Sequence, residues 1–213
     1  MHPEGFYHVY NRTNNQDLLF VNEENRRFFM QQYDHFLGYL TETCAWCLIP
    51  NHFHFLIKTK TKEAAITHLS KARSRELSKT EKLFLQGKRE FYQLINKAFT
   101  RFFQSYSEAF NNVHKRKGNL FYSSFKCQHV ANAYQLRNTI LYIHSNPIKH
   151  GLVSHSDDFK WCSWNTYKSI FSKKTVDKLV YEIFESKTGF IQAHEAYFEA
   201  MRNGLRKYEV ERL

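Results

Sequence analysis

Two hydrophobic periodicities run along the chain and predict its strands and helices. Short runs rich in aromatic and β-branched residues are typical of strands, particularly where apolar and polar positions alternate. Apolar residues spaced three and four apart are typical of amphipathic helices. We therefore predict strands at 6–10, 44–49, 53–58 and 125–130, and helices at 23–40, 60–77, 91–113, 133–146, from 176 onward and 190–206.

The order of these elements predicts the fold class. Strands are mixed with helices without a sustained strand-helix-strand repeat, so we expect an α+β fold with a central antiparallel β-sheet and packed helices. The polar stretch 78–89 is expected to be a loop or a frayed helix. The helix at 133–146 is expected to stop before Pro147, because the residue preceding a proline avoids the helical conformation.

Composition and charge indicate which kind of partner the protein binds. The 213 residues suffice for one substantial core, and the net charge is +11 with a pI near 9.4. Between Lys71 and Lys126 there are 13 Lys and Arg against 4 Glu, which indicates nucleic acid as the partner, with an anionic membrane as the weaker alternative. No apolar run reaches the roughly 18 residues of a membrane span, and the N-terminus is no secretory signal. The expected location is cytoplasmic, with no membrane partner.

Candidate chemistry begins with the sequence PNHFHF at residues 50–55. In a strand His52 and His54 point to one side and Phe53 and Phe55 to the other. Two imidazoles on one face can supply two ligands of a divalent metal. With 12 His in the chain such a pair can also arise by chance, so the hypothesis needs further partners.

The cysteines offer an alternative metal site. Cys44 and Cys47 form a Cys-x-x-Cys, and with His52 and His54 a structural zinc knuckle is conceivable. The gap between the cysteines and the histidines is too short for known finger spacings, and positions 44 and 47 of a strand face opposite ways. Core cysteines are the preferred interpretation.

The helix at 133–146 supplies a second group of candidates. Its apolar stripe consists of Leu136, Ile140 and Ile143, whereas Tyr142 lies among polar positions with Asn146 one turn further on the same side. An exposed structural tyrosine is the ordinary explanation. The chemical one is a nucleophile: a phenol attacks poorly at neutral pH unless its electrophile is polarised, and a metal bound to a phosphate oxygen polarises it.

Basic side chains outside these motifs are candidates for DNA contact. The loop after residue 113 is either only solvated or grips phosphates, and the two readings stay open. The candidate DNA-binding residues are Arg12, Lys97, Arg101, Lys115, Arg116, Lys117 and Lys126.

Two motifs in this order resemble a known family. His52-Phe53-His54 follows Pro50-Asn51, and residues 142–153 read YIHSNPIKHGLV. Together they resemble the single-tyrosine HUH transposases, particularly the REP-associated tyrosine transposases. Residues GNLF at 118–121, FK at 125–126 and WCSW at 161–164 are also similar to family positions. The resemblance covers about residues 6–170, which divides the chain into a catalytic domain at 1–171 and a C-terminal helical extension at 172–213.

The resemblance implies an HUH, ferredoxin-like core and a Mg²⁺- or Mn²⁺-dependent transesterification on single-stranded DNA next to hairpins. His52, His54 and Asn146 would bind the metal, although many relatives carry Gln at the third position. Tyr142 would attack the scissile phosphate, leaving a 5′-phosphotyrosine and a free 3′-hydroxyl. Nucleoid association and a homodimer are further expectations for this chain. The alternative is a domesticated, catalytically silent protein that binds hairpin DNA.

Overall fold

The predicted strands form one four-stranded antiparallel sheet. In the computed structural model, which describes residues 1–14, 17–72, 76–169, 179 and 181–204, the sheet has the order β2-β3-β1-β4. Every pair of neighbouring strands is antiparallel. The α+β prediction is therefore confirmed. The strands are β1 (Phe6–Arg12), β2 (Thr41–Ile49), β3 (His52–Thr59) and β4 (Lys126–Val130).

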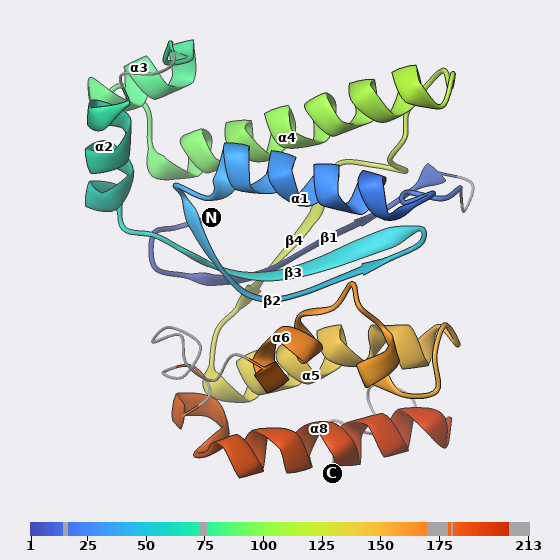
Figure 1. Ribbon diagram of the computed structural model, residues 1–213. Helices are drawn as coiled ribbons and strands as arrows, with labels where there is room; N and C mark the ends of the chain where they lie inside the picture. Colours follow the sequence, from blue (N-terminus) through green and yellow to red (C-terminus); the bar gives the residue numbers. More distant parts are fainter. Residues whose placement is uncertain (15–16, 73–75, 170–178, 180, 205–213) are drawn as a thin grey trace.

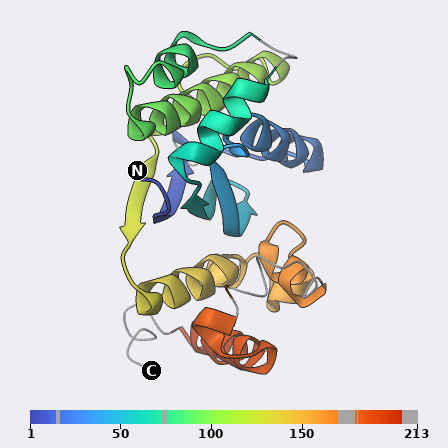
Figure 2. The ribbon, with the colours of Figure 1, turned by 90° about the vertical axis from the view of Figure 1, so that its left-hand side faces the viewer.

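Helices cover both faces of this sheet (Figures 1 and 2). One face carries α1 (Glu23–Leu37) and α4 (Phe91–Val113), with α2 (Lys62–Lys71) and α3 (Lys79–Leu85) beside them. The other face carries α5 (Ala133–Lys149) and α6 (Ser163–Ser169), and α8 (Lys187–Arg202) packs beyond α5. None of the described helices combines the length and apolar character needed to cross a membrane.

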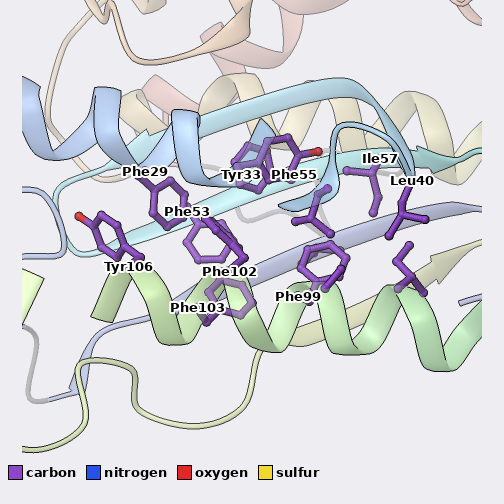
Figure 3. Close-up of a cluster of buried hydrophobic side chains, with 14 of the residues drawn as sticks. Phe29, Tyr33, Leu40, Phe53, Phe55, Ile57, Phe99, Phe102, Phe103 and Tyr106 are labelled. Atoms are coloured by element: carbon purple, nitrogen blue, oxygen red, sulfur yellow. The ribbon is translucent and has the colours of Figure 1, made fainter. Parts of the chain in front are cut away.

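The alternation of β3 creates two separate cores. Phe53, Phe55 and Ile57 point toward α1 and α4, where Figure 3 shows them among aromatic rings. The Phe55 ring stacks on Tyr33 with centroids 4.4 Å apart. Leu56 points to the opposite side and belongs to the second core, which α5 and α8 share. Both faces of β3 are therefore buried, between the helices on either side of the sheet.

The prediction that Pro147 ends the helix is wrong. α5 continues to Lys149 with Pro147 inside its last turn. Proline lacks the N–H that would bond to the carbonyl four residues back, and its ring crowds that carbonyl. The turn after it is still closed by the His150 N–H, which donates to the Asn146 carbonyl at 3.0 Å. The destabilisation by proline is confined to the last turn of the helix, and the packing of the buried Pro147 side chain offsets it.

Other helices also differ from the predicted ones in their presence or their boundaries. The stretch 78–89 contains α3, because Ser78 and Glu81 form a reciprocal capping box. A 3₁₀ turn at Ser156–Asp158 and helix α6 were not predicted. The helix predicted at 60–77 ends at Lys71, and the one predicted at 190–206 spans Lys187–Arg202. In the helix predicted from 176, residues 179 and 181–184 are helical, whereas 176–178 and 180 lie outside the described residues.

A buried chain of hydrogen bonds connects β2, α6, α5 and α8. His194 Nδ1 donates to the Phe190 carbonyl at 2.7 Å, so its Nε2 accepts from His144 Nδ1 at 2.8 Å. His144 Nε2 in turn accepts from Ser163 Oγ at 2.8 Å, and Ser163 Oγ accepts from the Trp46 N–H at 2.8 Å. His194 is neutral in this arrangement, because its Nδ1 donates and its Nε2 accepts, and burial lowers the pKa of His144 well below its usual value. Both imidazoles are fully buried.

This buried pair predicts a loss of stability in acid. Burial lowers the pKa of His194 to about 3, against roughly 6.5 in an unfolded chain. Above about pH 6.5 the imidazole is neutral in both states; below it, the unfolded chain binds a proton that the folded protein excludes. We expect urea denaturation to show a free energy of unfolding that decreases by up to about 1.4 kcal/mol per pH unit for this group as the pH falls from about 6 to 4.

The control is a histidine that is exposed in the fold. His194→Gln should show a shallower decrease of unfolding free energy with falling pH, whereas His155→Gln, at an exposed position, should keep the wild-type slope. Equal slopes in both variants would contradict the assignment of this acid sensitivity to His194.

Candidate active site

The imidazole face of β3 lies against the tyrosine of α5. The rings of His52 and His54 have centroids 5.2 Å apart, and the His54 and Tyr142 rings are 5.4 Å apart in an edge-to-face arrangement. The antiparallel register places Tyr10 and Arg12 of β1 opposite His54 and His52. A single chain therefore brings the two histidines and the tyrosine to one place, without a second subunit.

Hydrogen bonds orient both imidazoles. The Nδ1 of His52 lies 2.7 Å from Asn51 Oδ1, an oxygen that can only accept, so Nδ1 carries the proton and Nε2 keeps its lone pair. The Nδ1 of His54 bonds to His8 Nε2 at 2.9 Å, and His54 Nε2 is buried with no hydrogen-bond partner. Metal-binding histidines characteristically have one nitrogen held by a neighbouring group in this way.

Asn146 adds a buried oxygen beside them. Its Nδ2 donates to the Tyr142 carbonyl at 2.7 Å, which fixes the amide plane. Its Oδ1 is buried and accepts no hydrogen bond. A buried polar atom without a partner costs stability, so two of them, on His54 and Asn146, are expected where a ligand completes the site.

Burial keeps the two histidines neutral. It lowers the pKa of His52 to about 4; His150 and Lys149 add to the shift, and the nearby Asn146 side chain opposes it. Burial also holds the pKa of His54 well below its usual value, and His8 and His52 contribute. Neutral imidazoles are the form that binds a metal, because the lone pair must be available.

These donors fit a divalent ion with open coordination positions. Within the part of the chain that the structure describes, no three His, Cys, Asp or Glu side chains converge on a metal position. The candidate set is two imidazoles and one amide oxygen, with the remaining positions left for water or substrate oxygens. A catalytic metal site requires such open positions, whereas a structural zinc site is closed by four protein ligands.

His52, His54 and Tyr142 line a basic pocket of about 720 Å³, here called the Tyr142 pocket. Arg12, Lys126 and Lys149 contribute positive charge to its lining, and Lys149 Nζ lies 4.8 Å from the centre of the Tyr142 ring. None of the described residues that line it is acidic. An anionic ligand is therefore favoured here. The lining residues are Tyr10, Asn11, Arg12, Thr13, Asn14, Asn51, His52, His54, Tyr122, Ser123, Lys126, Tyr142, Lys149 and His150.

The structure separates the other basic candidates from this pocket. Lys97 and Arg101 lie on α4, on the opposite face of the sheet, and line a different depression with residues of α1 and α3. Lys115, Arg116 and Lys117 follow the end of α4. Arg116 donates to Asp17 at 2.6 Å and to Asn111 Oδ1 at 3.0 Å, so its guanidinium already fastens this loop.

The cysteines do not assemble a zinc knuckle among the described residues. Cys47 is buried beside Cys162, to which it pairs as an isolated β-bridge. Burial raises the pKa of Cys47 well above its usual value and that of Cys44 to about 12. Protonated thiols are poor metal ligands, which favours a packing role.

Sequence reasoning missed the groups that support the site. His8, Asn51, Tyr122, Lys149 and His150 support or line it, and the His150 ring lies 4.7 Å from that of His52. His8 lies in the first predicted strand, but its place beside His54 depends on the pairing of β1 with β3. A pattern of residues along one strand does not reveal that register.

The chain is similar to a protein of known structure. No protein-family model matches the sequence, and no curated protein sequence matches it. Among solved structures, a REP-associated tyrosine transposase bound to a REP hairpin is similar to this chain, with 16% sequence identity and a TM-score of 0.48. The similarity covers 79% of this chain and 81% of that chain. By itself it assigns neither a family nor an activity.

The ion pair at Arg116 predicts a stability effect that its lysine neighbours lack. Arg116→Ala should lower the free energy of unfolding by about 1 kcal/mol, because the side chain is only 25% exposed and bridges two loops. Lys117→Ala, at an exposed position, should change it by less than about 0.5 kcal/mol. Urea denaturation measures these changes, and a double-mutant cycle with Asp17→Asn measures the coupling between Arg116 and Asp17. Equal effects of Arg116→Ala and Lys117→Ala on the free energy of unfolding would contradict a stabilising role of the ion pair.

Proposed function

We propose that the protein is a metal-dependent transesterase that cleaves and rejoins single-stranded DNA near hairpins through a 5′-phosphotyrosine intermediate. One observation carries this proposal. A single basic pocket is lined by a tyrosine and by two neutral imidazoles with available nitrogens, and the buried amide oxygen of Asn146 lies beside them. The resemblance of the two motifs to the single-tyrosine HUH transposases supports the choice of substrate.

Tyr142 is the nucleophile in this proposal. Its phenolic oxygen forms a bond to the scissile phosphorus as the bond from phosphorus to the 3′ oxygen breaks. The proton lost by the phenol is balanced by the proton gained on the 3′ oxygen. The energy of the phosphodiester is kept in the phosphotyrosine, so a 3′-hydroxyl can later reverse the step and rejoin DNA.

His52, His54 and Asn146 would hold the divalent metal, Mg²⁺ or Mn²⁺. When bound, such an ion supplies charge that polarises the phosphate. The protein residues do the positioning. His8 and Asn51 fix the two imidazoles, while Arg12, Lys126 and Lys149 attract the phosphate backbone.

A covalent adduct tests the nucleophile. Incubation with hairpin-bearing single-stranded DNA and Mn²⁺ should give a protein–DNA adduct on denaturing gels. We expect no adduct in Tyr142→Phe, because the phenolic oxygen is gone. We also expect at least about 100-fold slower formation in His52→Ala and His54→Ala, since polarisation by a metal is worth several kcal/mol.

A tyrosine outside the pocket provides the matched control. Tyr134→Phe, at an exposed position on α5, should form the adduct at the wild-type rate. An adduct that persists in Tyr142→Phe would exclude Tyr142 as nucleophile. Hairpin DNA binding with no adduct on any substrate would instead support the catalytically silent binding protein.

Metal binding can be measured without DNA. Saturation with Mn²⁺ at 100 times its Kd should raise the free energy of unfolding by about 2.7 kcal/mol, and His54→Ala and Asn146→Ala should lose this gain. His8→Ala should weaken Mn²⁺ binding about 10- to 100-fold, because His54 loses the group that orients it. His155→Ala should bind as the wild type does. Stabilisation that is equal in all variants would place the ion elsewhere.

A further inference from the structure

An exposed aromatic ring forms part of the wall of the Tyr142 pocket. Tyr122 is 63% exposed and lies on the segment between α4 and β4. The Arg12 guanidinium lies 5.0 Å from the centre of its ring. A large aromatic side chain that contributes little to a core, at a fixed place beside a basic pocket, is characteristic of binding surfaces.

Backbone and side-chain contacts hold this segment in place. The Tyr122 N–H donates to the Arg12 carbonyl at 3.1 Å, and Asn11 Nδ2 donates to the Ser123 carbonyl at 3.0 Å. On the other side, the Phe121 ring packs edge-on to Phe103 of the first core with centroids 5.2 Å apart. The segment is tied to β1 and to the core on either side of Tyr122, so the tyrosine is presented outward from a rigid base.

The chemistry around the ring selects a ligand. A guanidinium near an aromatic ring orients it by cation–π attraction, and the exposed part of the ring is available for stacking. Arg12 and Lys126 add positive charge to the same pocket, and none of its described lining residues is acidic. A flat π-surface beside phosphate-binding charge matches a nucleotide with an unstacked base, which single strands offer and blunt duplexes do not.

We propose that Tyr122, oriented by Arg12, is a stacking platform for one unpaired nucleobase next to the phosphate that enters the Tyr142 pocket. The proposal rests on the function proposed above and deepens it, because it makes the pocket select an unpaired nucleotide in the single strand that flanks a hairpin. Tyr122 is a positioning residue here, since its ring contacts the base and not the reacting phosphorus.

Equilibrium binding in the Tyr142→Phe background tests this platform without cleavage. The probes are a fluorescent DNA hairpin with a single-stranded extension and a blunt hairpin with the same stem. Loss of one base–aromatic stack costs about 1–3 kcal/mol, so Tyr122→Ala should weaken binding of the extended hairpin about 5- to 150-fold. Binding of the blunt hairpin should change by less than about 2-fold, because its bases are already stacked.

Two controls separate stacking from folding and charge. Tyr122→Phe keeps the aromatic face and should bind within about 2-fold of the parent, since stacking needs the ring and not the hydroxyl. Tyr181→Ala removes a tyrosine of matching exposure, 62%, that does not line the pocket, and should leave affinity unchanged.

An abasic scan then identifies the stacked base. At one position of the extension, removal of the base should weaken binding by the parent as much as Tyr122→Ala does, and combining the two changes should cost no more than either alone. Additive losses at every position would overturn the proposal. So would an unchanged affinity of Tyr122→Ala, an equal loss for the blunt hairpin, or no measurable binding of the extended probe.

These outcomes differ from failure of the catalytic proposal. Normal adduct formation through Tyr142, together with unchanged binding by Tyr122→Ala, would remove the platform and keep the enzyme. Absence of any adduct, with binding that still depends on Tyr122 and on one base, would remove the enzyme and keep the platform.

Discussion

The two-sided burial of β3 is the constraint on which the rest of the structure depends. Phe53 and Phe55 are committed to the core under α1 and α4, so His52 and His54 must point to the other face. A shift of the strand by one residue would place the imidazoles among phenylalanine rings and the rings in the pocket. The large aromatic core therefore determines the orientation of the candidate metal ligands.

The opposite wall of the site is α5, whose polar residues are buried. Ser145 and Asn146 are inaccessible to solvent. His144 is hydrogen-bonded to Ser163 of α6 and to His194 of α8. These bonds fix the rotation of α5 about its axis, and that rotation decides that Tyr142 faces His54. Helix α8 thus contributes to the site from a distance, because its His194 is one end of the buried chain of hydrogen bonds.

The site holds two buried polar atoms that the surrounding protein leaves without hydrogen bonds. They are His54 Nε2 on β3 and Asn146 Oδ1 on α5. Unpaired buried polar atoms cost stability, so their presence close together is informative. The aromatic packing beneath β3 and the hydrogen bonds of His8 and Asn51 offset that cost and hold the imidazoles ready for a ligand.

The sequence by itself determined what depends on short-range periodicity. The helix at 91–113 matches α4 at both ends, and alternation in β3 correctly placed both histidines on one face. Only the tertiary structure decided which elements meet. The polar side of α5 is buried against other elements, and Arg116 pairs with Asp17, 99 residues away. Periodicity reports which face of an element is apolar, but the partner of each face follows from strand order, register and long-range packing, which no local pattern encodes.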